Sequence, residues 1–193
     1  MMKNIILASK SPRRIEMLSK YLEKIIVFSP DTDERVNDLD LPETTVMKIA
    51  FEKAWKASCD CETKGIIIAA DTVVFLDKIM GKPKDDEEAF SMLKSLSGKI
   101  HSVYTGVCVI DSTDGTKVVD YEKTFVEFNP LTDDFIMRYL ETGEHLDKAG
   151  AYGIQGFGEL MVKRIDGCYN NVKGLPLTKL NNILTKHFSL KLL

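Results

Sequence analysis

One carboxylate interrupts an otherwise apolar stretch of this chain. Residues 66–75, IIIAADTVVF, are hydrophobic or small except for Asp71 and Thr72. Both flanks have the composition of a buried strand, and an uncompensated buried carboxylate is very costly. Asp71 must therefore be paired, hydrogen-bonded, bound to a metal, or placed where the strand reaches a cleft. A functional role would be metal ligand or general base, and the alternative is a structural acid tied to backbone or to a lysine.

Two arginines stand where the first turn of a helix is expected. In the segment 9–14, SKSPRR, Pro12 is suited to the first helical position, and Arg13 and Arg14 follow it. The unpaired N–H groups of a first helical turn bind anions, and that turn normally favours acidic residues. A bound polyphosphate would reverse the small cost of these two arginines. The alternative is a pair of solvated side chains, and the chain has no Walker-type loop.

Two lysines extend this cationic set. Lys53 falls inside the apolar face of a helix expected over residues 43–58, and Lys82 follows a turn in the segment 80–83, MGKP. A lysine in an apolar face often extends its ammonium group from the edge of that face. The functional interpretation places Lys53 in a cleft and returns Lys82 to the end of the sheet that carries Asp71. The alternative for Lys82 is an exposed lysine in a turn.

Two loops add oxygen and amide groups. Residues 31–34, DTDE, follow an apolar run, and such an acidic loop can hold Mg²⁺ through Glu34. Its Asp-x-Asp spacing also imitates that of aspartyl-phosphate phosphatases, with Asp31 as nucleophile. The residues that flank the pair do not fit that family, and a solvated loop is favoured for Asp31 and Asp33.

Residues 147–156, DKAGAYGIQG, contain Gln155, whose amide can both donate to and accept from the edge of a base. The alternative is a plain glycine-rich loop.

One arrangement accounts for these residues together. Cations at a helix start, with Lys53 and Lys82, would hold a polyphosphate. Glu34 and Asp71 would hold a divalent metal or activate water, and Gln155 would contact a base. The sequence therefore predicts a nucleoside-triphosphate site.

The elements that must position these groups alternate along the chain. Strands are expected at residues 4–8, 24–28, 66–76, 102–110, 118–128 and 160–165, and helices at 11–22, 43–58, 85–96, 132–140 and 176–187. Asp85 with Glu88 predicts a capped helix start, and Asp114-Gly115 predicts a hairpin turn. We expect one α/β domain over residues 1–193, with a mixed twisted sheet, flanking helices and two lobes around a cleft.

Composition excludes several other classes of protein. The chain has 193 residues, 44% of them hydrophobic, and a formal net charge of −3, so we expect neither nucleic acid nor membrane as a partner. The amino-terminal apolar run is too short for a signal peptide, and no segment has the length of a membrane span. The four cysteines lack zinc-ligand spacing. We therefore expect a soluble, cytoplasmic protein.

The ordered motifs resemble a known family. The segments LASKSPRR, AADTVV, GKP, SGKIHSVYTGV, DKAGAYGIQG and NNVKGLPL are similar, in this order, to those of the Maf nucleotide pyrophosphatases, once called septum formation inhibitors. The resemblance runs from Leu7 to Leu177, and it is specific because the whole set occurs in order.

The resemblance implies a fold related to the inosine-triphosphate pyrophosphatases and the hydrolysis of nucleoside triphosphates between the α and β phosphates. It implies Mg²⁺, or Mn²⁺, with Asp71 as proton acceptor, and Glu34 and Asp71 as metal ligands. Base choice in the dTTP and UTP branch maps onto Arg13, Thr72 and Gln155. The substrate-binding set is Ser9, Arg13, Arg14, Lys53, Thr72, Lys82 and Gln155. A homodimer, the removal of modified nucleotides and a link to cell-division arrest are further implications.

Two positions depart from the family pattern. Glu144-His145 stands where Glu-Pro is expected, and Cys168 stands where Ser is expected. Neither touches the predicted chemistry, although both can alter loop packing.

The competing hypothesis is a non-catalytic nucleotide-binding regulator of septum formation, which the presence of Asp71 and the lysines disfavours.

Overall fold

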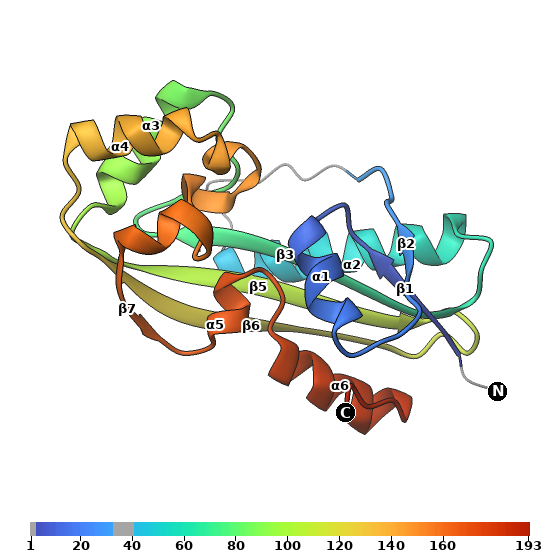
Figure 1. The fold of residues 1–193 in the computed structure, drawn as a ribbon. Coiled ribbons are helices and arrows are strands. Elements are labelled where there is room, and N and C mark those ends of the chain that lie inside the picture. The colour runs from blue at the N-terminus through green and yellow to red at the C-terminus, as the bar shows by residue number, and fades with distance from the viewer. Residues whose placement is uncertain (1–2, 33–40) are drawn as a thin grey trace.

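A computed structural model describes residues 3–32 and 41–193 of the chain, and it shows a long twisted sheet with helices on both faces (Figure 1). The strands of this sheet are β1 (Asn4–Ala8), β2 (Ile26–Phe28), β3 (Gly65–Phe75), β4 (Ile79–Met80), β5 (Ile100–Asp111), β6 (Lys117–Phe128) and β7 (Val162–Asp166). Their spatial order is β2-β1-β3-β5-β6-β7, and β4 pairs with β3. Strand β1 is parallel to β2 and β3, and all other pairs are antiparallel. The expected mixed α/β sheet is confirmed.

Five helices of the described residues begin within one residue of their predicted starts, and a sixth, the short helix Tyr169–Val172, was not predicted. They are α1 (Pro12–Ser19), α2 (Pro42–Asp60), α3 (Asp86–Leu96), α4 (Asp133–Glu141), α5 (Tyr169–Val172) and α6 (Leu177–Phe188), with short 3₁₀ turns η1 (Glu144–Asp147), η2 (Ala149–Ala151) and η3 (Gly156–Met161). Asp85 accepts a hydrogen bond from the backbone N–H of Glu88, and Thr132 accepts one from that of Phe135, as expected of N-caps.

Three predicted boundaries are wrong. Helix α1 ends at Ser19 instead of residue 22, because the carbonyl of Leu18 accepts from both Tyr21 and Leu22 and closes a turn. Strand β2 is limited to three residues by its pairing with β1, and β7 begins only at Val162 because residues 160–161 lie in η3. Turn hydrogen bonds and strand pairing set these limits, which residue composition does not reveal.

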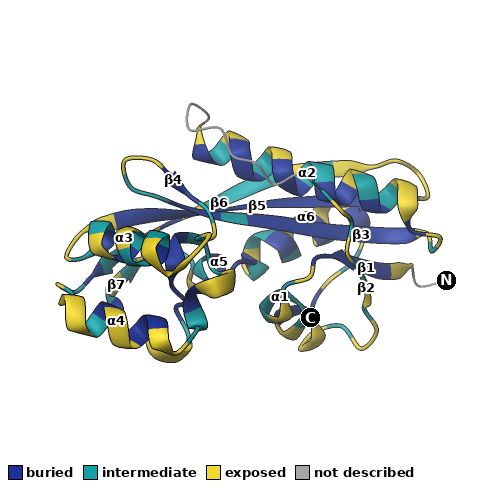
Figure 2. Ribbon diagram, turned by 90° about the horizontal axis from the view of Figure 1, so that it is seen from above, coloured by how far each residue is buried: buried dark blue, intermediate teal, exposed yellow. Residues whose placement is uncertain are grey.

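The two faces of β3 carry separate hydrophobic clusters. Ile66, Ile68 and Ala70 pack with α1 and α6 on one face, while Ile67 and Ala69 pack with α2 on the other (Figure 2). Side chains alternate across a strand, so successive residues of β3 reach opposite layers. Burial on both faces explains why this strand reads as an almost continuous apolar run.

A second lobe lies at the far end of the long strands. Helices α3 and α4 pack there with η2, the start of β5 and the end of β6, around a cluster that includes Val74, Val126, Phe128 and Tyr152. The backbone N–H of Gly150 donates to the carbonyl of Gly81, which joins the 147–156 segment to the turn before Lys82. Strand β3 therefore runs from one lobe into the other.

Helix α2 lies unusually close to the middle of the sheet. Gly106 of β5 is paired with Asp71, and a Cβ atom at Gly106 would meet the carbonyl oxygen of Val46 at 2.2 Å. Only glycine permits this approach of helix to strand. The approach places Lys53, one and a half to two turns further along α2, over Asp71.

Candidate active site

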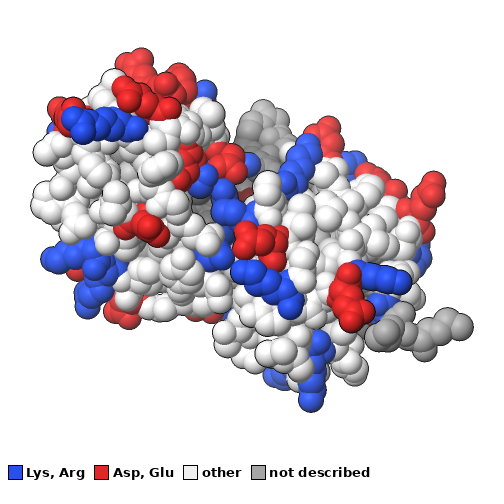
Figure 3. Space-filling model, viewed as in Figure 1, with Lys and Arg blue, Asp and Glu red and all other residues white. Residues whose placement is uncertain are grey.

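A cavity of about 290 Å³ lies between the two lobes, where β3 passes from one to the other. The ends of β1 and β2, the start of α1, and the 147–155 and 172–174 segments form its walls. Figure 3 shows a hollow at this place, with Lys and Arg side chains gathered around it. Among the described lining residues, seven are cationic and three are acidic: Lys10, Arg13, Arg14, Lys53, Lys82, Lys148 and Lys173 against Asp31, Asp71 and Asp147. The cavity is suited to a polyanion.

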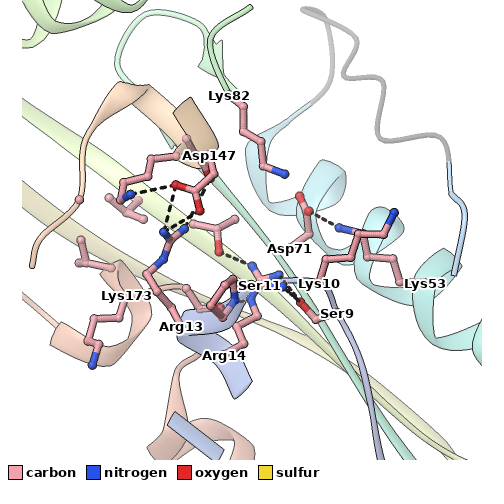
Figure 4. A pocket seen from close by; sticks show the side chains of 18 of the residues that line it. Ser9, Lys10, Ser11, Arg13, Arg14, Lys53, Asp71, Lys82, Asp147 and Lys173 are labelled. Atoms are coloured by element: carbon pink, nitrogen blue, oxygen red, sulfur yellow. Dashed lines mark hydrogen bonds and ion pairs between the residues drawn. The ribbon is translucent and has the colours of Figure 1, made fainter. Parts of the chain in front are cut away.

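Asp71 and Lys53 form a buried ion pair on the cavity wall. The ammonium nitrogen of Lys53 donates to Oδ1 of Asp71 at 2.8 Å, and Asp71 is 8% exposed (Figure 4). Since α2 covers this face of β3, the alternation of the strand points Asp71 toward the helix. The interpretation of Lys53 as an edge lysine with a solvated head is wrong, because its ammonium group is directed inward.

Thr72 points to the opposite layer and meets Arg14. The guanidinium of Arg14 donates from Nη2 to the Thr72 hydroxyl at 3.0 Å and from Nη1 to the carbonyl of Ala70 at 2.8 Å. It also donates from Nε to the carbonyl of Gly174 at 2.7 Å. Thr105 of β5 lies 2.9 Å from Thr72, oxygen to oxygen. Arg14 thus fixes the start of α1 to β3 and to the loop before α6.

Arg13 reaches across the cavity to the second lobe. Its Nη1 lies 3.1 and 3.3 Å from the two carboxylate oxygens of Asp147, at the end of η1 (Figure 4). Lys148 donates to the same carboxylate at 2.8 Å. Burial raises the pKa of Asp147, but the hydrogen bonds and charges of Lys148 and Arg13 lower that pKa more, so it lies below its ordinary value.

The other predicted substrate residues also line the cavity. Ser9 accepts hydrogen bonds from the backbone N–H of Ser11 and from Arg14, at the end of β1. Lys82 points into the space beside Asp71, and Gln155 borders the cavity from the second lobe. The structure therefore brings together all seven predicted substrate-binding residues and Asp71. Whether they bind substrate stays a prediction.

Four further charged residues of the cavity were not assigned a role from the sequence: Lys10, Asp147, Lys148 and Lys173. All four stand in motif segments, which was the available signal, but a charge in a loop does not reveal the direction of its side chain. Figure 4 shows that Lys173 points away from Asp71, whereas Asp147 faces Arg13.

The single carboxylate of Asp71 fits a magnesium site in which waters and substrate phosphates supply the other ligands. Mg²⁺ in nucleotide sites uses one or two carboxylates, several waters and substrate phosphates instead of a full protein cage. Within residues 3–32 and 41–193, no group of three or more His, Cys, Asp or Glu side chains is placed to hold a metal. Asp71 supplies one carboxylate to the cavity, and Asp31 also lines it. Glu34, the second predicted ligand, lies outside the described residues.

Both departures from the family pattern lie outside the cavity lining. His145 is buried, and its Nε2 lies 2.8 Å from Oδ1 of Asp86 at the start of α3. Cys168 contacts Thr124 through its backbone N–H and carbonyl. They take part in loop packing, in agreement with the sequence interpretation.

The fold and cavity define an α/β protein with an anion-binding cleft and a buried carboxylate on its wall. The Maf-like protein family matches residues 4–187, and the chain therefore belongs to the Maf family. It is 49% identical over 193 residues to a protein of Alkaliphilus oremlandii named dTTP/UTP pyrophosphatase, with 100% of both chains covered. It is 47% identical over 190 residues to a protein of the same name from Caldicellulosiruptor saccharolyticus, with 96% and 95% covered.

Two solved structures are also similar to the chain. The Ham1 protein of Staphylococcus aureus aligns with a TM-score of 0.47 at 19% identity, covering 81% of this chain and 78% of that one. A nucleoside-triphosphatase / dITP/XTP pyrophosphatase of Mycobacterium abscessus aligns with a TM-score of 0.44 at 17% identity, covering 65% of this chain and 72% of that one.

No helix within the described ranges has the length and apolar character needed to cross a membrane.

Proposed function

We propose that this protein hydrolyses dTTP, UTP and related or modified pyrimidine nucleotides to the monophosphate and pyrophosphate. The observation that carries the proposal is a carboxylate, Asp71, held by Lys53 on the wall of a cavity lined by cations. The names of relatives that are 47–49% identical over nearly the whole chain support the same activity.

Substrate binding follows from the charges of the cavity. Arg13, Lys53 and Lys82 come from three different elements and surround one space that a triphosphate can fill. Their positive charges neutralise phosphate oxygens and favour the charge that grows on the departing pyrophosphate. Gln155 and Thr72, together with Arg13, are the groups proposed to select the base, and all three line the cavity.

Asp71 is proposed to take the proton of the attacking water. The water oxygen forms a bond to phosphorus, the P–O bond between the α and β phosphates breaks, and the bridging oxygen leaves with pyrophosphate. Lys53 orients the Asp71 carboxylate through the 2.8 Å contact. General-base catalysis of this kind contributes about 10²–10⁴-fold.

A divalent cation, which we propose to be Mg²⁺ or Mn²⁺, would be held by Asp71 and, as the sequence indicates, by Glu34. When bound, such an ion neutralises phosphate charge and polarises phosphoryl oxygens. The homodimer and the link to septum formation stay predictions of the resemblance. The cytoplasmic location and the single-domain assignment stay predictions from composition and sequence pattern.

Product analysis tests the proposal. The protein is incubated with Mg²⁺ or Mn²⁺ and, separately, dTTP, UTP, CTP, ATP and GTP, and pyrophosphate and inorganic phosphate are measured in parallel. We expect pyrophosphate from dTTP and UTP, with at least a 100-fold loss of turnover in Asp71→Asn. Asp77→Asn, in the exposed bend after β3, is the matched control and should retain full turnover.

Each other outcome has a definite meaning. Full activity in Asp71→Asn would refute the role of this carboxylate. Nucleotide binding without turnover in the unmodified protein would favour the non-catalytic regulator. Release of inorganic phosphate in place of pyrophosphate would favour the phosphatase chemistry considered for Asp31.

A further inference from the structure

The carboxylate of Glu144, in η1, is enclosed by the segment that carries Gln155. Its Oε2 accepts a hydrogen bond from the backbone N–H of Phe157 at 2.9 Å, and its Oε1 accepts one from that of Gly158 at 3.1 Å. The hydroxyl of Tyr139 donates to Oε1 at 3.3 Å. Three donors thus converge on one side chain, and two of them belong to the backbone just beyond Gln155.

Glycines let the chain fold closely around this carboxylate. A Cβ atom at Gly156 would lie 2.4 Å from Oε2 of Glu144, and one at Gly153 would lie 3.1 Å from Oε1. Gly156 also has a φ of +73°, in the left-handed region that favours glycine. The glycines on both sides of Gln155 are therefore fitted to Glu144, in addition to any role in approaching a ligand.

Gln155 lies between these two glycines, half-buried, on the wall of the cavity. Its own backbone is extended, with φ −119° and ψ 159°. Because Glu144 fixes the backbone two and three residues further on, and packs against Gly153 and Gly156, it sets the direction in which the Gln155 side chain leaves the loop. Glycine-rich backbone has little stiffness of its own, so this direction depends on the anchor.

The same turn also reaches the opposite wall. The backbone carbonyl of Glu144 accepts a hydrogen bond from Nζ of Lys148 at 2.5 Å, and Lys148 donates to Asp147, which holds Arg13. Residues 144–148 therefore connect two of the side chains proposed to select the base, Gln155 through the backbone of its loop and Arg13 through Asp147.

We propose that Glu144 is a positioning residue for base selection, acting through Gln155. The inference rests on the proposed function, because it concerns the same cavity and its substrate. Glu144 does not line the cavity, so its effect must pass through the backbone of the Gln155 loop. Without the carboxylate, Gln155 samples several directions, and the enzyme loses discrimination among bases more than it loses turnover.

The test substitutes Glu144 by Gln, which keeps the size but directs an amide N–H₂ group toward a backbone N–H donor. The ratio of kcat/KM for dTTP to that for GTP is measured, together with the ratio of the two dissociation constants. We expect both ratios to fall about tenfold in Glu144→Gln, in the range of one lost hydrogen bond to a charged group, while kcat for dTTP changes less.

Two further variants separate positioning from simple loss of stability. Glu159→Gln, an exposed position in the same segment, is the matched control and should leave the ratios unchanged. Combined with Gln155→Ala, Glu144→Gln should add no further loss of selectivity, since the two residues act in one chain of contacts. If Glu144 had only a structural role, Glu144→Gln would lower the melting temperature and leave the dTTP to GTP ratios unchanged.

The proposal is overturned if Glu144→Gln keeps the base ratios of the unmodified protein, if the double variant shows additive losses, or if the unmodified protein does not discriminate among bases. Absence of turnover with every nucleotide would instead refute the proposed function, and the ratio of dissociation constants would still decide the inference. If Glu144→Gln does not fold, Tyr139→Phe decides it: a fall of about threefold in the ratio supports the proposal, and no change overturns it.

Discussion

The ammonium nitrogen of Lys53 lies 2.8 Å from Oδ1 of Asp71, and only 9% and 11% of the two side chains are exposed. The pair joins the middle of α2 to the middle of β3, at the wall of the cavity. Breaking a buried pair leaves one charge without its partner, which costs more than the pair contributes in net stability. The pair therefore fixes the carboxylate that we propose as the catalytic base, and it also constrains the fold.

Replacing Lys53 by Met tests both consequences. We expect the free energy of unfolding to fall by about 2–4 kcal/mol, because the Asp71 carboxylate stays buried without this ammonium group. Turnover of dTTP should fall by more than the stability loss explains. Denaturant unfolding and steady-state kinetics measure the two effects, with exposed Lys48→Met of α2 as control. The double variant with Asp71→Asn should recover part of the stability, and a double variant less stable than Lys53→Met would contradict the account.

Replacing Gly106 by Ala tests how α2 is seated on the sheet. The added methyl would lie 2.2 Å from the carbonyl oxygen of Val46, which is backbone and cannot move alone. We expect a loss of about 3 kcal/mol or more of unfolding free energy, together with lower activity as Lys53 shifts from Asp71. Gly81→Ala is the control, since a Cβ atom there meets nothing within 4 Å. Equal melting temperatures for the two variants would contradict the prediction.

The buried His101 predicts a pH dependence of stability. Burial lowers the pKa of His101 to about 4, and its Nε2 lies 2.7 Å from the hydroxyl of Tyr152. Below its ordinary pKa of about 6.5, the unfolded chain binds a proton that the folded protein does not bind until about pH 4. Stability should therefore fall by about 3 kcal/mol as pH drops through this window, and change no further from this residue below it.

Comparison with His101→Gln isolates this contribution. Urea unfolding of both proteins between pH 8 and pH 4 should show a smaller loss of stability for the variant, while carboxyl groups contribute alike to both. Parallel stability curves over this range would show that His101 does not titrate as described.

Replacing Asp147 by Asn tests the contact across the cavity. The pair with Arg13 is half-exposed, so we expect a stability change below about 1 kcal/mol. Because the pKa of Asp147 is lowered, its small contribution is present above about pH 4 and is lost as pH falls through the folded pKa. Removing this negative charge should strengthen pyrophosphate binding about fivefold at low salt.

Calorimetric titration with pyrophosphate measures this effect. Asp134→Asn, whose partner Arg138 lies on the surface of α4, removes the same charge away from the cavity and serves as control. Weaker pyrophosphate binding by Asp147→Asn would show that the carboxylate orients Arg13 more than it competes with the anion.

Local rules were enough to predict most elements of the fold. Asp85 and Thr132 mark helix starts because their side chains bond to the backbone three residues on, and Pro12 begins a helix because its missing N–H has no partner to lose. Each of these effects acts over a few residues. The predictions fail at the end of α1, where a turn closed by the Leu18 carbonyl ends the helix, and at β2 and β7, whose lengths depend on pairing with distant strands.

The sequence by itself identified Asp71, because one charge in an apolar strand is costly wherever the strand lies, and the ordered motifs gathered the other candidate residues. Only the tertiary structure decided their partners. Arg13 contacts Asp147, which lies 134 positions further along the chain. Glu144 contacts a backbone N–H group of the Gln155 loop, and residue types do not indicate which backbone groups form such contacts. Sequence patterns report the period and end signals of one element, whereas such contacts depend on strand order, register and the seating of helices, which the whole chain sets together.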